Sequence, residues 1–156
     1  MKIKLIMIGK TTGDLYIDAI EDYTNRIKHY NNFSIHVIPG LKNTKKLSQE
    51  QQKQAEGELI LKELTAQDTV ILLDERGKEY RSMEFAKWLE NKQLTAQNIV
   101  FVIGGPYGFS DSIYKRANEK ISLSKMTFSH QMVRLIFVEQ LYRACTIIKG
   151  ESYHHE

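Results

Sequence analysis

Two uninterrupted apolar runs constrain the fold of this chain most strongly. They cover residues 69–73 (TVILL) and 99–103 (IVFVI). A strand with one face in water alternates polar and apolar residues, whereas these runs leave neither face polar. Each run therefore predicts a strand that is covered on both sides, as in a parallel sheet between two layers of helices.

Shorter segments place further strands and helices around these two runs. Residues 3–7, 33–37 and 121–123 have strand patterns. Helix start signals stand between the strands, and Ser48 with Gln51 three residues later has the spacing of a capping box. We expect a mostly solvent-facing helix after Ser48 and a polar turn over 74–78. The remaining start signals, each expected to cap a helix, are Asp14, Ser82 and Ser110, the last opening a helix to about residue 119.

This order predicts an α/β fold with five strands and five helices. The sheet is mostly parallel, with helices on both faces, because strands alternate with helices along the chain. We find no repeat, low-complexity stretch or linker, so we expect a single domain over residues 1–156.

The predicted terminal helix, which starts near His130 and stops at Lys149–Gly150, is apolar on most of its circumference. We therefore expect it to be buried on more than one side, with Cys145 as a buried, inert thiol. Arg134 and Arg143 are nine residues apart and do not share a helix face. At least one should meet something outside its own helix, and the open candidates for either arginine are Glu139, a phosphate or a second subunit.

Composition narrows the class of protein. The chain has 156 residues, of which 42% are hydrophobic and 26% charged, as in a globular domain with a core. We find no run near the roughly 20 apolar residues that cross a bilayer and no cleavage site after the first apolar run. With one cysteine, the sequence predicts a cytoplasmic protein without a membrane partner. The net charge of +3 permits an anionic partner without requiring one.

The sequence lacks the motifs of several common kinds of binding and catalytic site. The glycine-rich segment 104–108 has neither the Gly-Lys-Ser/Thr of a phosphate-binding loop nor the spacing of a dinucleotide fingerprint. We find no Gly-x-Ser-x-Gly nucleophile motif. The histidines do not suggest a metal site, because His154 and His155 lack a third ligand and the others are scattered.

Three segments at predicted strand ends are the places where a ligand would bind. In open α/β sheets ligands bind beyond the carboxyl ends of the strands. Those ends carry the polar segment 74–78, the glycine segment 104–108 and the segment 123–128, which lies within a Ser-rich turn over residues 122–129. Adjacent glycines permit either a close approach by a ligand or a simple tight turn, and both interpretations stay open here.

A combination of motifs resembles a known family. The chain closely resembles the small members of the SPOUT, or α/β-knot, class of S-adenosylmethionine-dependent methyltransferases that modify a pseudouridine of large-subunit ribosomal RNA. The resemblance covers essentially the whole chain. It rests on LLDERGK at 72–78, FVIGGPYG at 101–108, LSKMTFSHQMVR at 123–134, EQLYRA at 139–144 and YHH at 153–155.

The resemblance implies a fold and a cofactor that composition and periodicity do not. It implies a C-terminal trefoil knot, although connections in α/β folds are almost always unknotted. It also implies a homodimer that uses the terminal helix, and S-adenosylmethionine held mostly by backbone contacts. The donor site maps onto Leu73, Gly104, Gly105, Leu123, Ser124, Lys125, Met126, Thr127 and Phe128.

The expected reaction is methylation of N3 of a pseudouridine in the assembled ribosome. Methyl transfer is an in-line displacement in which the protein positions both partners, and the imide nitrogen must lose a proton. We expect Arg143, Tyr153 and His154 to be catalytic, and Arg134 and His155 to contact RNA; the base is not assigned. Three alternatives stay open: another RNA such as tRNA, a non-catalytic nucleotide- or RNA-binding module, and a frayed tail without a role.

Overall fold

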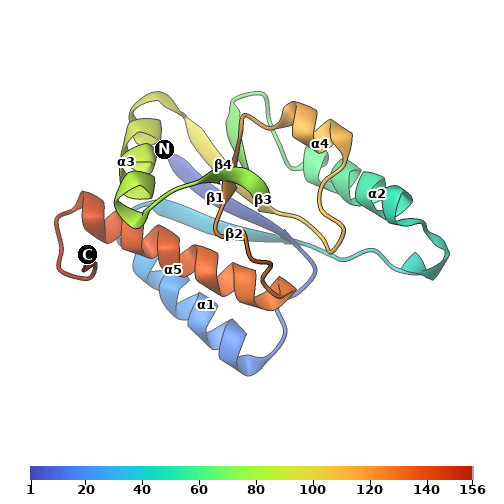
Figure 1. Cartoon of the computed structure of the whole chain (residues 1–156), viewed down its shortest axis with the longest axis horizontal. Helices are drawn as coiled ribbons and strands as arrows, with labels where there is room; N and C mark the ends of the chain where they lie inside the picture. The colour runs from blue at the N-terminus through green and yellow to red at the C-terminus, as the bar shows by residue number, and fades with distance from the viewer. Residues whose placement is uncertain (156) are drawn as a thin grey trace.

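All five strands of the sheet run parallel, in the order β2-β1-β4-β3-β5. The structure is a computed structural model, and it describes residues 1–155 (Figure 1). The parallel α/β sheet predicted from the sequence is confirmed. Its strands are β1 (Lys2–Ile8), β2 (Asn32–Ile38), β3 (Asp68–Glu79), β4 (Asn98–Ile103) and β5 (Glu119–Ser122).

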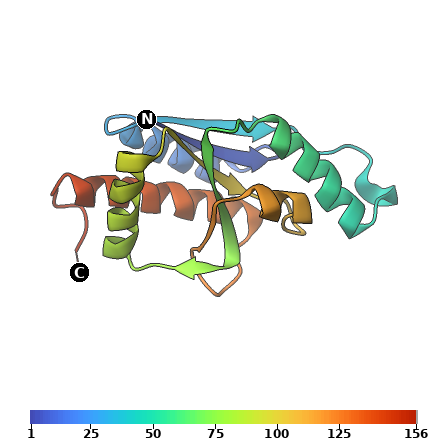
Figure 2. The ribbon, with the colours of Figure 1, turned by 90° about the horizontal axis from the view of Figure 1, so that it is seen from above.

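Five helices cover the two faces of this sheet. Helices α1, α3 and α5 pack on one face, while α2 and α4 pack together on the other (Figures 1 and 2). A short 3₁₀ turn, η1 (Thr44–Lys46), precedes α2. The helices are α1 (Asp14–Ile27), α2 (Gln49–Lys62), α3 (Ser82–Thr95), α4 (Asp111–Arg116) and α5 (His130–Ile148).

The central strands bury alternate residues in two separate cores. Leu5 of β1 and Phe101 of β4 belong to the core under α1, α3 and α5. Ile6 and Val102, the next residues of the same strands, belong to the core under α2 and α4. Strands buried on both faces need apolar residues at every position, which explains the uninterrupted runs.

Strand β3 differs from its prediction, because it continues through the expected turn at 74–78 to Glu79. The strand bulges there, since Leu73 and Lys78 both pair with Ile121 of β5. A side chain at Gly77 would place its Cβ 2.6 Å from the β5 backbone, so this close approach requires glycine. The predicted turn was therefore wrong: a polar bulge within a strand has the composition of a turn.

Helix ends differ from the prediction by a residue or more. The capping box at Ser48 and Gln51 is confirmed. Asp14 and Ser82, however, are the first residues of α1 and α3 and not their caps. Helix α4 ends at Arg116 and not near residue 119, because β5 begins there.

Helix α5 is buried on several sides, as its composition predicted. It packs between α1 and α3, and Ser129 caps its start by accepting a hydrogen bond from the Met132 amide. Cys145 is buried, and burial raises the pKa of its thiol to about 11, in agreement with an inert cysteine.

Arg134 of α5 lies in the core with no exposed surface. Its Nη2 donates to the Ile8 carbonyl at 2.8 Å and its Nη1 donates to the Thr11 hydroxyl at 3.0 Å. It therefore meets the end of β1, which confirms that one arginine of α5 contacts another element.

Threading of the C-terminal segment into a knot stays a prediction. No helix within residues 1–155 is both long and apolar enough to cross a membrane.

We predict that Arg134→Met lowers the free energy of unfolding by about 1–3 kcal/mol, because the Ile8 carbonyl and Thr11 hydroxyl lose a buried donor. Urea denaturation would measure this change. Arg76→Met is the matched control, since Arg76 is exposed and should change stability by about 0.5 kcal/mol or less. Equal unfolding midpoints for the two variants would contradict the role of Arg134.

Candidate functional site

A cavity of about 550 Å³ opens at the carboxyl edge of the sheet. It lies between the ends of β3, β4 and β5 and the start of α5. Eight of the nine residues predicted for a donor site line it: Leu73, Gly104, Gly105, Leu123, Ser124, Met126, Thr127 and Phe128. Lys125 does not; its amino group points to the surface, 3.8 Å from the Glu79 carboxylate.

The glycine segment after β4 is a tight turn that also has no room for side chains. The Gly108 amide donates to the Gly105 carbonyl at 3.2 Å, and Gly108 has a φ of +85°. A Cβ on Gly105 would lie 2.4 Å from a carboxylate oxygen of Glu56. The tight turn is thus present, while close approach of a ligand to this backbone stays a prediction.

Glu56 on α2 supports the glycine segment from beneath. Its side chain is buried, with 4% of the residue exposed. Gln52 donates to Oε2 at 3.4 Å, whereas Oε1 has no hydrogen-bond partner among the described residues. Burial raises the pKa of this carboxyl. The sequence prediction of a mostly solvent-facing helix missed Glu56; the adjacent Gly57, which allows α4 to approach closely, was the available signal.

Hydroxyl groups fix the Ser-rich segment 123–128 on the opposite wall. The Ser122 hydroxyl donates to the Ser124 carbonyl at 2.9 Å, and the Ser124 hydroxyl accepts from the Met126 amide at 2.9 Å. The Thr127 hydroxyl donates to Glu75 at 3.2 Å, which joins this wall to the bulge of β3. Met126 lines the cavity yet is 78% exposed, so it stands at the rim.

The bulge of β3 lines the cavity with Asp74, Glu75 and Arg76, within the segment 74–78 that the sequence predicted as a place for a ligand without predicting any of these residues individually. Asp74 and Glu75 both line the cavity. Asp74 accepts hydrogen bonds from the Tyr114 hydroxyl and from the Arg76 amide. Burial and the bond to Asp74 raise the pKa of Tyr114 to about 12, so the phenol stays protonated. The signal was the LLDERGK motif, which was interpreted as a turn.

His130 lines the cavity at the first turn of α5. Burial lowers the pKa of this imidazole, and the nearby Arg134 charge lowers it further, so the ring is neutral at neutral pH. Its Nε2 lies 2.9 Å from Arg134 Nη2, which is always a donor. An Nε2 that accepts this bond leaves the ring proton on Nδ1, whereas the same nitrogen also lies 3.3 Å from the Ile8 carbonyl oxygen, a contact that requires the proton on Nε2.

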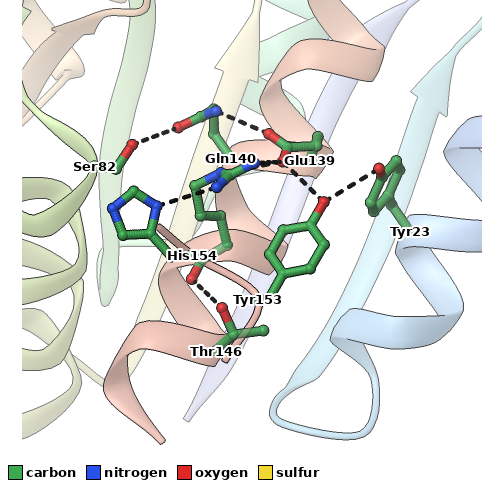
Figure 3. Close-up of polar contacts among 8 residues, drawn as sticks. Tyr23, Ser82, Glu139, Gln140, Thr146, Tyr153 and His154 are labelled. Atoms are coloured by element: carbon green, nitrogen blue, oxygen red, sulfur yellow. Dashed lines mark hydrogen bonds and ion pairs between the residues drawn. The ribbon is translucent and has the colours of Figure 1, made fainter. Parts of the chain in front are cut away.

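The predicted tail residues gather around Glu139 of α5, as Figure 3 shows. Arg143 donates to Glu139 through Nη2 at 2.6 Å and Nε at 3.1 Å. The Tyr153 hydroxyl donates to the same carboxylate at 3.0 Å. Arg143 Nη1 lies 3.0 Å from His154 Nδ1. Three residues predicted to act together are thus in direct or shared contact.

Aromatic packing holds this tail against α5 and α1. The ring of Tyr153 packs edge-on against Tyr142, with centroids 4.7 Å apart, and its hydroxyl lies 3.4 Å from that of Tyr23. Burial raises the pKa of Tyr153. His155 is exposed. The tail is therefore ordered through His154 by specific contacts and is not a frayed end.

The cavity is lined by the first turn of α5, whereas the tail follows the opposite end of this helix (Figure 1). Arg143 is 13 residues beyond His130, which is about 20 Å along the helix axis. The structure thus brings the predicted donor residues together and the predicted tail residues together, but not the two groups. Arg134 belongs to neither, and its burial argues against the predicted RNA contact.

Within residues 1–155, no three His, Cys, Asp or Glu side chains are placed to hold a metal ion.

We predict that Gly105→Ala lowers the free energy of unfolding by about 1–3 kcal/mol, because its Cβ would overlap the Glu56 carboxylate. Glu56→Ala should relieve most of this loss, which a double-mutant cycle in urea would measure. Gly40→Ala is the control, since its nearest neighbour would be 3.8 Å away. Additive effects of the Glu56 and Gly105 changes would contradict the overlap.

Comparison with known proteins identifies the family of this chain. A family model described as predicted SPOUT methyltransferase matches residues 1–154. Proteins named ribosomal RNA large subunit methyltransferase H are similar over the full length of both chains: 62% identical in Phocaeicola vulgatus, 60% in Bacteroides fragilis and 55% in Flavobacterium johnsoniae. The chain with this glycine-walled cavity therefore belongs to the SPOUT methyltransferase family.

Proposed function

We propose that this protein transfers a methyl group from S-adenosylmethionine to N3 of a pseudouridine in large-subunit ribosomal RNA. The observation that carries the proposal is the cavity at the carboxyl edge of the sheet, walled by both glycine and acidic residues. The full-length similarity to proteins named ribosomal RNA large subunit methyltransferase H supports the RNA substrate. The nucleotide and its N3 position rest on the family resemblance.

The walls of the cavity fit the chemistry of this donor. Its volume of about 550 Å³ lies within the range of roughly 300–1,000 Å³ typical of small-molecule sites. Asp74 and Glu75 offer negative charge to a donor with an ammonium and a sulfonium group. Gly104 and Gly105 expose their backbone, and Ile103 and Leu123 offer apolar surface to a flat base. S-adenosylmethionine supplies an electrophilic methyl group when bound.

The tail residues suit the acceptor base. Glu139 orients both the Arg143 guanidinium and the Tyr153 hydroxyl before any substrate arrives. The raised pKa of Tyr153 keeps its phenol a neutral hydrogen-bond donor. The cation of Arg143 favours the anionic form of an imide, which is the form that attacks a methyl group. His155 is exposed and free to meet the phosphate backbone.

A homodimer would bring a tail to each cavity. Helix α5 keeps apolar side chains on its outer face, where Met132 is 36% exposed and Ile136 is half-buried. A two-fold pairing of antiparallel α5 helices would cover this face and would set the tail of one copy beside the cavity of the other. Each catalytic site would then contain residues of both protomers.

We expect S-adenosylmethionine to bind the purified protein, with transfer of labelled methyl to intact ribosomes. Calorimetry measures the first step and radiolabel incorporation the second. Intact ribosomes should be better acceptors than naked RNA, because shaped RNA is recognised largely through its assembled form. If the protein does not bind S-adenosylmethionine at high micromolar concentration, a non-catalytic binding module is favoured. If the protein methylates tRNA and not ribosomes, its substrate is another RNA.

We predict that Arg143→Ala lowers methyl transfer by at least about 100-fold, because a charge that stabilises the acceptor is lost. Donor binding should change much less than methyl transfer, since Arg143 is proposed to contact the acceptor base and not the donor. Co-folding this variant with a Leu123→Trp variant, whose larger side chain narrows the cavity, should restore about a quarter of wild-type activity, because half the dimers are mixed and each has one complete site. An inactive mixture would contradict shared sites.

A further inference from the structure

Two loops at the carboxyl edge of the sheet, after β1 and β2, carry lysines and no carboxylate. Residues 1–13 and 29–49 contain no Asp or Glu. Lys10 lies in the first stretch, and Lys42, Lys45 and Lys46 lie in the second; all four are exposed. Within residues 1–155 none of the four forms an ion pair. Four uncompensated charges are a marked local excess in a chain whose net charge is only +3.

The two loops lie against each other at the carboxyl ends of β1 and β2. The Gly9 amide donates to the Ile38 carbonyl at 2.8 Å. A Cβ on Gly40 would lie 3.8 Å from the Gly9 Cα, so the loop backbones are in contact. The four lysines therefore lie on two adjoining loops, and we call them together the lysine ledge (Lys10, Lys42, Lys45 and Lys46).

The backbone that carries the lysine ledge is held in place. Arg134 binds the Thr11 hydroxyl, and the Gln131 side chain accepts from the Thr12 amide at 3.0 Å, so α5 holds the first loop. The second loop contains η1, closed by the Leu47 amide donating to the Thr44 carbonyl at 3.0 Å. Lysines on ordered backbone can mark a fixed path for a ligand.

The lysine ledge continues the edge of the sheet that contains the cavity. Strand β1 lies between β2 and β4, and the segment after β4 lines the cavity. The connections after β1, β2 and β4 all emerge at the same end of the sheet (Figures 1 and 2). On the other side of the cavity the bulge of β3 carries Asp74 and Glu75. Arg76 lies beside them, so the wall toward β3 carries both signs of charge, whereas the loops toward β2 carry lysines without carboxylates.

We propose that the lysine ledge binds the phosphate backbone of the RNA next to the methylated nucleotide. This inference rests on the proposed function, because the RNA must cross the cavity for the ledge to meet it. Lysine ammonium groups suit this task, since they bind phosphates as flexible point charges and read no sequence. The ledge would set the direction in which the RNA lies across the opening.

The test compares two double variants with the same change in charge. Lys45→Gln with Lys46→Gln removes half of the lysine ledge. Lys28→Gln with Lys87→Gln removes two exposed lysines of α1 and α3 instead. Ribosome binding is measured across a series of salt concentrations, donor binding by calorimetry and folding by urea denaturation.

We expect the ledge variant to bind ribosomes about tenfold more weakly near 0.1 M salt, and the slope of log affinity against log salt to shrink by about 1.5. Donor binding and stability should match the wild type. The role of the lysine ledge would be overturned if the ledge variant kept the ribosome affinity and salt slope of the wild type, or if the control variant lost as much affinity. The proposed function would still stand in that case, provided that the wild-type protein methylates ribosomes. Wild-type protein without affinity for ribosomes would overturn both.

Discussion

The buried guanidinium of Arg134 connects the parts of this molecule that matter for its site. A buried cation costs several kcal/mol in lost hydration, and burial lowers the pKa of this arginine. The cost is offset by three acceptors: the Ile8 carbonyl, the Thr11 hydroxyl and the neutral ring of His130. These contacts join the first turn of α5 to the end of β1. The His130 side of the cavity and the loop that carries Lys10 are therefore set by one side chain.

The cavity is shaped more by backbone than by side chains. Gly105 lies directly above the Glu56 carboxylate, and Gly77 lies against the backbone of β5. Both contacts need a missing Cβ, so the glycines bring main-chain atoms where side chains would otherwise stand. On the facing wall, the hydroxyl groups of Ser122 and Ser124 form hydrogen bonds with the backbone and so fix the position of the main chain. Such a site recognises a ligand through fixed backbone groups, which lose little conformational entropy on binding.

The fold was largely predictable because its information is local. Apolar runs identify β3 and β4 through burial on both faces, and the capping box marks the start of α2. The residues that the sequence did not reveal depend on contacts between distant segments. Glu56 has the appearance of a surface glutamate until the segment after β4 folds over it. Likewise, Asp74 and Glu75 resemble a polar turn until β5 pairs on both sides of the bulge.

Eight of the predicted donor-site residues line the cavity, but Glu56 and the charged wall from β3 were not predicted residue by residue, nor was the arrangement of the site. The glycine and Ser-rich segments follow strands whose carboxyl ends share one edge, so their meeting follows from the topology. Arg143 lies on α5 and Tyr153 follows this helix closely in sequence, so their contacts with Glu139 of α5 are also local. The distance between these two groups is set by the length of α5, which no motif encodes.

That length decides how the proposed chemistry is organised. A helix cannot shorten, so a cavity at one end of α5 and a tail at the other cannot meet within a chain. In the proposed dimer the same rigidity becomes an advantage. Each tail is already ordered by Glu139 and Tyr142 before a partner arrives, so pairing costs little further entropy. Dimerisation and activity would then be linked, because the outer face of α5 that pairs the copies also sets the position of both tails.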